Sequence, residues 1–266
     1  MAINKRKLRV TELDFDNIKD NLKTFLKAQT EFKDYDFEGS GMSVLLDTLA
    51  YNTHYLGFNA NMLANEMFLD SAALRSSVVS HAKTLGYEVS SPRAPIATVN
   101  ISLSTTASTK TMPAGTAFTT TVDGTSYQFV TVSDITSNST GSSIPFDSVN
   151  IYEGSYVTTK YTVDTSDVDQ RFLLSDARSD TTTLKVKVQN SASDSTTTTY
   201  TKATDITQLS ASSTVYFIQE TDSGLFEIYF GDGKVSTALS DGNIVILQYV
   251  VTNKTASNGA TVFGSP

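Results

Sequence analysis

Three residues in this chain have the types required for a hydrolytic triad, in which a carboxylate orients a histidine that activates a serine. They are Ser43, Asp47 and His54, and their steps of four and seven residues would bring all three side chains to one face of a helix. A triad also needs an oxyanion hole and a strained turn at the nucleophile, and a regular helix provides neither. We therefore interpret these residues as part of a helix surface and expect that the chain is not an enzyme.

The residues that are able to bind metals also lack the spacing of known sites. The chain has no cysteine and two histidines, His54 and His81, so it holds no thiolate-ligated zinc or iron–sulfur cluster. Asp164, Asp167 and Asp169 form an acidic cluster, but a calcium loop requires ligands at alternate positions, a central glycine and a terminal glutamate. We interpret this cluster as a solvated loop and expect no metal and no cofactor.

Two glycine-containing segments suggest anion binding at first sight, but simpler interpretations account for both. Residues 231–233 (Gly-Asp-Gly) lack the Lys-Ser/Thr pair of a phosphate-binding loop and predict a hairpin turn between two strands. Residues 39–41 (Gly-Ser-Gly) predict a non-helical segment directly before a helix. We interpret a short basic arm, formed by Lys5, Arg6, Lys7 and Arg9, as a flexible terminus rather than as the docking site of an acidic partner.

Net charge and hydropathy restrict the partners that the chain can have. Twenty lysines and arginines face 28 aspartates and glutamates, which gives a net charge of −8 and argues against nucleic-acid binding. No apolar run approaches the 18 or more residues of a membrane span, so we expect no membrane insertion. Residues 1–10 lack the apolar core of a signal peptide.

The first part of the chain, up to the prolines at 92 and 95, has the periodicity of helices. Asp14 or Asp16 is placed to cap a helix whose apolar residues recur every three or four positions. A longer helix is expected over residues 42–67, where tyrosines and a phenylalanine widen the apolar surface beyond one stripe, so that this helix requires more than one neighbour. A third helix is expected from an N-cap at Ser71 to a left-handed stop at Gly86. Together these segments predict a small helical bundle over residues 1–95.

The apolar content of this bundle exceeds what a small three-helix unit is able to bury, so part of it is expected to form an interface. The candidate interface residues are Phe15, Ile18, Leu22, Phe25, Leu45, Leu49, Leu56 and Leu63.

From residue 96 onward the periodicity changes to two, which is typical of half-buried strands. Val99, Ile101 and Leu103 alternate with polar residues, and serine- and threonine-rich runs separate the strands. The strongest strand signals are residues 215–218, 226–230 and 244–251. The fold class is therefore predicted to be α+β, with a mostly antiparallel β-rich region over residues 96–266 that continues beyond the chain end.

Several segments resemble a known family. Residues 34–40 (DYDFEGS), 45–52 (LLDTLAYN), 59–69 (NANMLANEMFL) and 82–87 (AKTLGY) are similar to the N-terminal part of the baseplate wedge subunit of T-even-like contractile-tailed phages. Residues 230–233 (FGDG), 241–243 (DGN), Tyr249 and 257–259 (SNG) resemble the baseplate J-like module of contractile injection machines. Members of this family are considerably longer, so the chain is expected to be either a fragment or a shortened subunit.

The resemblance implies a structural role in the virion. In the family, two copies of the subunit join another wedge protein through a shared helical bundle, and six wedges form a ring around the central hub. The implied partners are therefore a second copy, other baseplate wedge proteins, and the central hub or sheath-initiator proteins. The implied location is the tail baseplate, assembled in the host cytoplasm. Charged substitutions at Leu22 or Leu49 are expected to block this assembly.

Two other interpretations belong to different functional classes. A secreted or fibre-like carbohydrate-binding β protein would explain the serine- and threonine-rich strands, with Tyr152, Tyr156 and Tyr161 as candidate sugar contacts. A tail-associated glycosidase would require two neighbouring carboxylates, for which Glu153, Glu220 and Glu227 are the candidates.

Overall fold

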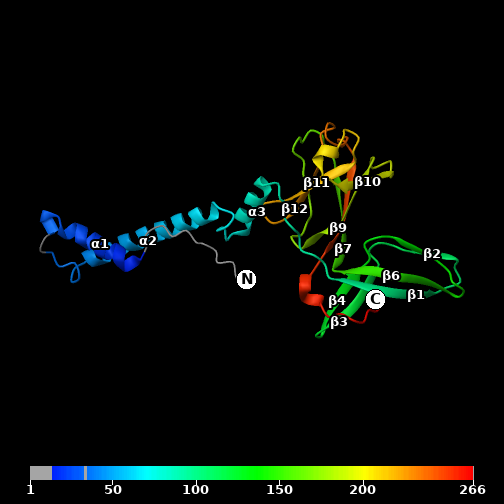
Figure 1. Ribbon diagram of the computed structural model, residues 1–266, viewed down its shortest axis with the longest axis horizontal. Coiled ribbons are helices and arrows are strands. Elements are labelled where there is room, and N and C mark those ends of the chain that lie inside the picture. Colours follow the sequence, from blue (N-terminus) through cyan, green and yellow to red (C-terminus); the bar gives the residue numbers. More distant parts are fainter. Residues whose placement is uncertain (1–13, 33–34, 266) are drawn as a thin grey trace. The chain divides into compact units, whose positions relative to one another are not determined.

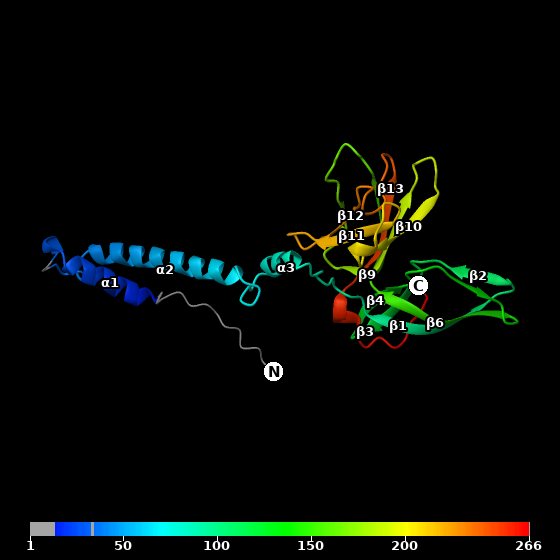
Figure 2. The ribbon, with the colours of Figure 1, turned by 45° about the horizontal axis from the view of Figure 1, so that its top comes forward.

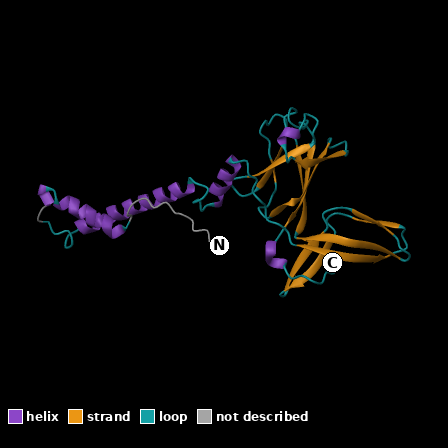
Figure 3. Cartoon of the chain, in the orientation of Figure 1, coloured by secondary structure: helices purple, strands orange, loops and turns teal. Residues whose placement is uncertain are grey.

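The chain folds into a helical unit and a β unit. The computed structural model describes residues 14–32 and 35–265. The chain divides into these two compact units between Glu88 and Val89. Figure 1 and Figure 3 show that the three α-helices precede all of the strands in the sequence. The α+β class predicted from the two periodicities is confirmed.

The helical unit is built on a hairpin of α1 (Phe15–Lys27) and α2 (Met42–Glu66). The Asp14 carboxylate caps α1 by accepting hydrogen bonds from the amides of Asp16 and Asn17. Lys19 of α1 forms an ion pair of 2.5 Å with Asp47 of α2, which fixes the antiparallel alignment of the two helices in Figure 1. The positions of both helices agree with those predicted from the periodicity of apolar residues in the sequence.

The third helix, α3 (Arg75–Thr84), begins four residues after the predicted N-cap. The Ser71 hydroxyl instead donates to the carbonyl of Asn65 at 2.6 Å, so Ser71 closes the turn after α2 and does not cap α3. The prediction at the other end is confirmed. Gly86 has a φ of +74°, and the Tyr87 amide donates to the carbonyl of Ala82 at 2.8 Å, as in a Schellman motif.

The helices pack less compactly than the predicted three-helix bundle. The extensive helix–helix contact lies between α1 and α2, whereas α3 is joined to the end of α2. The ring nitrogen Nε2 of His81 lies 2.8 Å from the carbonyl oxygen of Glu66. One long helix with a single extended neighbour leaves much of its apolar surface in solvent.

The β unit begins with a four-stranded antiparallel sheet. Its order is β1 (Ile96–Ser104), β6 (Ser143–Glu153), β4 (Thr125–Val130) and β3 (Ala117–Val122), and a separate pair joins β2 (Thr109–Met112) to β5 (Ile135–Asn138). Asp123 and Gly124 have φ values of +49° and +80°, which form the tight hairpin between β3 and β4. The outer edge of β3 is partly covered by the segment around Gly264. The Thr119 amide donates to the carbonyl of Gly264 at 2.8 Å, and the Gly264 amide donates to the carbonyl of Thr119 at 2.9 Å.

The second sheet has seven strands and encloses the larger core. Its order is β7 (Ser155–Thr162), β13 (Ile244–Val251), β9 (Ser179–Gln189), β10 (Thr197–Lys202), β11 (Val215–Glu220), β12 (Phe226–Phe230) and β8 (Phe172–Leu173). The pair β10–β11 is parallel and the other pairs are antiparallel. The two edges of this curled sheet approach each other, because the Tyr161 hydroxyl on β7 donates to the carbonyl of Leu173 on β8 at 2.7 Å. Figure 2 shows β9, β10, β11, β12 and β13 of this sheet grouped together.

One predicted connection in this sheet is wrong. Residues 231–233 do not form a hairpin, because β12 pairs with β11 and β8, whereas β13 pairs with β7 and β9. The loop after β12 turns back on itself instead, and the Gly233 amide donates to the carbonyl of Ser236 at 2.9 Å. A Cβ at Gly231 would lie 2.0 Å from the Ser236 hydroxyl oxygen, so this glycine is required by a close contact.

Two buried carboxylates bind segments outside the strands. One holds the segment that follows β13, and the other holds the segment that precedes β1. Glu153, at the end of β6, accepts hydrogen bonds from the Thr252 hydroxyl at 2.6 Å and from the Asn253 amide at 2.8 Å. Asp180 on β9 accepts a hydrogen bond from the Ala94 amide at 2.8 Å. Burial of a charged group is tolerated when its oxygens are bonded in this way.

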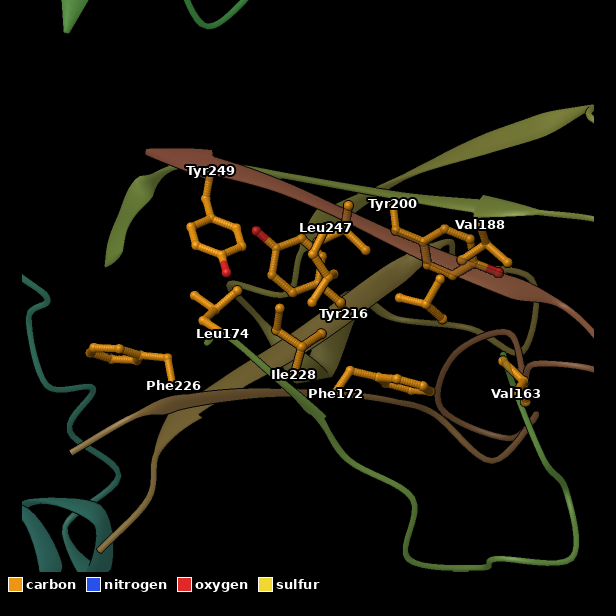
Figure 4. Packing of buried hydrophobic residues seen from close by; sticks show 12 residues of the cluster. Val163, Phe172, Leu174, Val188, Tyr200, Tyr216, Phe226, Ile228, Leu247 and Tyr249 are labelled. Atoms are coloured by element: carbon orange, nitrogen blue, oxygen red, sulfur yellow. The ribbon is translucent and has the colours of Figure 1, made fainter. Parts of the chain in front are cut away.

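The hydroxyl of Tyr249 is a testable part of the larger core, in which its side chain points inward from β13 (Figure 4). This hydroxyl lies 2.8 Å from the Ser175 hydroxyl and accepts from the Ser175 amide at 3.1 Å. Tyr249→Phe is expected to lower the free energy of unfolding by about 1–2 kcal/mol, because the Ser175 groups lose their partner in a largely buried setting. Urea denaturation followed by far-UV circular dichroism measures the change. Tyr127→Phe is the control, since the Tyr127 hydroxyl makes no hydrogen bond within the described residues, and an equal loss in both variants would contradict the assignment.

Candidate interaction surfaces

The α2 helix has one face covered by its own chain. Leu46 and Ala50 are its two buried residues, and they lie on the side that packs against α1. Apart from Met42, which is half-buried, the other large apolar residues of α2 are exposed. An α-helix turns 100° per residue, so the position of each exposed residue around the axis follows from its number.

The first exposed group is the leucine stripe, which we define as Leu45, Leu49, Leu56 and Leu63. These side chains are between 47% and 66% exposed. Steps of four, seven and seven residues place them along one line of the helix, the spacing by which helices pack in coiled coils. All four belong to the candidate interface set.

The second exposed group is the aromatic stripe, which lies about a third of a turn from the leucine stripe around the axis. Its five side chains are between 44% and 67% exposed, and the rings of Tyr51 and Tyr55 stack with their centroids 6.4 Å apart. Polar Thr48, Asn52 and Asn59 separate the two stripes. The helix therefore has two distinct apolar faces in addition to the one covered by α1. The members of the aromatic stripe are Val44, Tyr51, Tyr55, Phe58 and Met62.

The candidate residues on α1 divide into two groups. Phe15, Ile18 and Leu22 are half-buried on the side of α1 that packs on α2, so they hold the hairpin together. Phe25 is 64% exposed and belongs to the solvent-facing surface.

Further exposed apolar residues continue beyond α2. They lie between α2 and α3 and directly after α3, and none of them belongs to the candidate interface set. Exposed apolar surface of this extent is typical of protein–protein interfaces. These residues are Met67, Phe68, Leu69, Leu74, Leu85 and Tyr87.

The residues considered for catalysis and metal binding are engaged elsewhere. Asp47 pairs with Lys19, which removes the orienting carboxylate from the proposed triad. Asp164 accepts hydrogen bonds from the amide and hydroxyl of Ser166, and Asp167 accepts from the Asp169 amide, so two of the three carboxylates shape their own loop. Within residues 14–32 and 35–265, no group of three or more histidine or acidic side chains is arranged to hold a metal ion.

The glycosidase candidates lie in different surroundings. Glu153 is bonded to Thr252 and Asn253. Glu227 faces Gln219 across the β11–β12 pair, whereas Glu220 faces Phe226, so the two glutamates lie on opposite faces of that sheet.

The three candidate sugar-contacting tyrosines do not form an exposed aromatic platform. Tyr161 packs on Phe172 with ring centroids 5.7 Å apart, and Tyr152 and Tyr156 pack against a buried cluster that includes Val130.

None of the helices that the structure describes is long and apolar enough to cross a membrane. The basic arm at residues 5–9 lies outside the described residues.

The junction between α2 and α3 provides a prediction of pH dependence. The Glu66 carboxylate accepts hydrogen bonds from the amides of Ala73 at 2.9 Å and Leu74 at 3.2 Å. These bonds, with the Ala73 amide contributing most, hold the pKa of Glu66 below its usual value near 4.5. A lowered pKa in the folded state means that Glu66 stabilises the junction above pH 4.5, and this contribution is lost as the pH falls through the folded-state pKa.

We therefore expect the amide protons of residues 73–74 to exchange faster as the pH falls below 4.5, relative to their intrinsic rates. Hydrogen exchange measured by NMR between pH 6 and 3 tests this expectation. Glu66→Gln should show fast exchange of both amides already at pH 6. Asp70→Asn changes an exposed carboxylate of the same loop and should behave like the parent chain. Protection that is independent of pH in the parent chain would contradict the role of Glu66.

Comparison with known proteins gives matches to both units. Residues 14–87 match a family described as baseplate wedge protein gp6-like, helical domain. Residues 157–263 match one described as bacteriophage baseplate wedge protein gp6, third domain. Baseplate wedge protein gp6 of Enterobacteria phage T4 is 32% identical over 271 residues, which cover 94% of this chain and 40% of that protein. The chain thus spans 40% of the length of this curated relative, and both stripes of α2 lie inside the first match.

Proposed function

Because this chain belongs to the gp6-like family of baseplate wedge proteins, we propose that it is a structural subunit of a phage tail baseplate and joins a shared helical bundle. The observation that carries the proposal is the pair of exposed apolar stripes on α2. Residues 1–95 would be the region that docks, and residues 96–266 the region that contacts the ring. The role is contact between proteins, not catalysis.

The number of stripes determines the number of neighbours. One apolar stripe of a helix is covered by one packed helix, so two separate stripes require two helices in addition to α1. A second copy of the chain would supply one of them, and a helix of another baseplate wedge protein would supply the other. The heptad spacing within the leucine stripe favours a near-parallel or antiparallel alignment of the partner helix.

The wider assembly follows from the resemblance of the sequence to the wedge family. We propose that six wedges close around the central hub and that the β unit faces the neighbouring subunits of this ring. Contacts with hub or sheath-initiator proteins belong to the same proposal. The chain would be assembled in the host cytoplasm and would then remain in the virion.

Co-expression of the chain with the other wedge proteins of its own phage tests the proposal. We expect a stable complex that contains two copies of the chain, and an electron micrograph of the native particle should place the chain in a six-fold ring. Native mass spectrometry gives the copy number. A monodisperse monomer that binds none of the tail proteins would overturn the proposal.

A further inference from the structure

The segment after β13 contains Asn258 followed by Gly259, the one place in the sequence where an asparagine precedes a glycine. Both residues are exposed. The side-chain carbon Cγ of an asparagine is electrophilic, and attack on it by the next backbone nitrogen closes a five-membered ring. A glycine at that next position has no Cβ to shield its nitrogen. This pair therefore has the chemistry of a deamidation site, and the local geometry decides whether the folded chain permits the reaction.

Asn258 and Gly259 are the central residues of a type II β-turn. Asn258 has φ and ψ of −60° and +138°, and Gly259 has a φ of +96°. The turn is closed by the Ala260 amide, which donates to the carbonyl of Ser257 at 3.3 Å. Type I and type II turns differ by a flip of the central peptide group, which leaves the closing hydrogen bond in place. The rotation of ψ in this flip carries the Gly259 nitrogen toward Cγ of Asn258.

No hydrogen bond opposes this flip in the part of the chain that the structure describes. The Asn258 carbonyl and the Gly259 amide, which form the central peptide group, have no hydrogen-bond partner there, and neither has the Asn258 side chain. A Cβ placed on Gly259 would meet no atom within 4 Å, so the space around the turn is open. By contrast, the side-chain amide of Asn190 donates to Asp194 at 2.7 Å, which holds that asparagine in place.

The reaction needs water and no other reagent. The Gly259 nitrogen, after losing its proton to hydroxide, bonds to Cγ of Asn258, and the Cγ–Nδ2 bond breaks as Nδ2 takes a proton from water and leaves as ammonia. Water then adds to one of the two carbonyl carbons of the resulting succinimide. Addition at Cγ gives aspartate, whereas addition at the backbone carbonyl carbon gives isoaspartate, in which the main chain runs through the side chain. Both products add a negative charge, and isoaspartate also lengthens the backbone by one carbon atom.

The residues that follow this turn cover part of the four-stranded sheet, and we call residues 260–264 the edge segment. Phe263 packs against the buried cluster that includes Phe129, with the two ring centroids 5.0 Å apart. Gly264 forms the two backbone hydrogen bonds with Thr119 on β3. A longer backbone at the turn shifts the edge segment relative to the strand and the ring on which it packs. The isoaspartate product is therefore incompatible with the contacts that hold the edge segment.

We propose that Asn258 deamidates spontaneously in the folded chain, through a succinimide formed with Gly259, and that the isoaspartate product releases the edge segment from β3. The outer edge of β3 then has backbone amides and carbonyls without partners, which are able to pair with a strand of another chain. The modification is thus a slow and irreversible change of this surface. It goes beyond the proposed structural role and does not depend on it.

Peptide mapping by mass spectrometry tests the site. The full chain, kept at 37 °C between pH 7 and 9, is expected to gain about 1 Da at residue 258, because an amide becomes an acid. The rate should rise about tenfold per pH unit, since the attacking nitrogen must first lose its proton. It should lie within about threefold of the rate in urea, because a reaction that requires no unfolding is not slowed by the fold. A folded chain that keeps Asn258 intact while the chain in urea is converted would overturn the proposal.

Hydrogen exchange measured by NMR tests the release of the edge segment. In the chain aged until residue 258 is converted, the amides of Thr119 and Gly264 are expected to exchange at least about tenfold faster than in the fresh chain, because their mutual hydrogen bonds are lost. Electron-transfer dissociation of the same sample identifies the isoaspartate.

Two variants separate the longer backbone from the other effects of ageing. N258Q keeps a side-chain amide, but its attack would have to close a six-membered ring, which forms far more slowly, so the aged variant should retain the protection of both amides. Freshly prepared N258D adds the negative charge without lengthening the backbone and should keep this protection within about twofold. Unchanged protection in the aged parent chain, or an equal loss in aged N258Q, would show that isoaspartate does not release the edge segment.

Discussion

Leu49→Glu is expected to abolish incorporation of the chain into the baseplate wedge while leaving its own fold intact. Leu49 is 47% exposed on α2, so a charged side chain at this position remains hydrated in the isolated chain and changes its stability by less than about 0.5 kcal/mol. In a helical bundle the same carboxylate would be buried without a partner. That burial costs roughly 3 kcal/mol, which corresponds to about a hundredfold loss of affinity.

The measurement is the yield of wedge complex after co-expression, together with the circular dichroism spectrum of the free variant. Asn17→Glu is a matched control, because it introduces the same charge at an exposed position of α1 outside both stripes. This control should assemble at the yield of the parent chain. If Leu49→Glu also assembled at the parent yield, the leucine stripe would not be the interface.

The structure separates two positions that the sequence treats alike. Leu22 and Leu49 have the same apolar period, and a charge at either is expected to block assembly. Leu22 is half-buried on the side of α1 that packs on α2, so a charge there would also weaken the hairpin itself. Leu49 is therefore the position at which a loss of assembly reports on the partner alone.

Local patterns predicted the secondary structure well because local forces determine it. The cap at Asp14, the extent of α2 and the stop at Gly86 depend on residues within one turn of each other. The alternation of Val99, Ile101 and Leu103 likewise predicts β1 directly. The periodicity of apolar residues within a single strand or helix shows which of its faces is apolar.

Errors arose where distant segments decide the structure. The Gly-Asp-Gly turn at residues 231–233 has the composition of a hairpin, yet β13 pairs with β7 and β9, which precede it by dozens of residues. The early start expected for α3 failed because Glu66, at the end of α2, bonds the amides of Ala73 and Leu74 and holds these residues outside the helix. Neither interaction leaves a signal in the local sequence.

Prediction of surface features from the sequence is limited in the same way. The leucine stripe was predicted because its members share one helix and one period. The row of Lys160, Lys185 and Lys187 combines β7 and β9, which are separated in the sheet by β13, a strand that follows both of them in the sequence. The sequence shows that Lys185 and Lys187 lie on one face of a strand, but only the strand order places Lys160 in the same row.

Gly154→Ala is expected to have the largest effect on stability in the β unit. Gly154 joins β6 to β7 with a φ of +124°, and a Cβ at this position would lie 2.2 Å from the carbonyl oxygen of Val251. The clash is with backbone of β13, so no side-chain rotation relieves it. The variant is expected to lose more than about 4 kcal/mol of stability, since β6, β7 and β13 must separate to accommodate one methyl group.

Gly141→Ala distinguishes the close contact from backbone strain. Gly141 also has a positive φ, +95°, but an added Cβ would meet no atom within 4 Å. Its replacement is expected to cost only about 1–3 kcal/mol, the usual penalty for a side chain in this region of φ. Urea denaturation and hydrogen exchange of residues 244–251 compare the two variants. Equal losses would mean that φ alone makes Gly154 necessary, whereas a larger loss at Gly154 means that the approach of β13 fixes the junction of the two sheets.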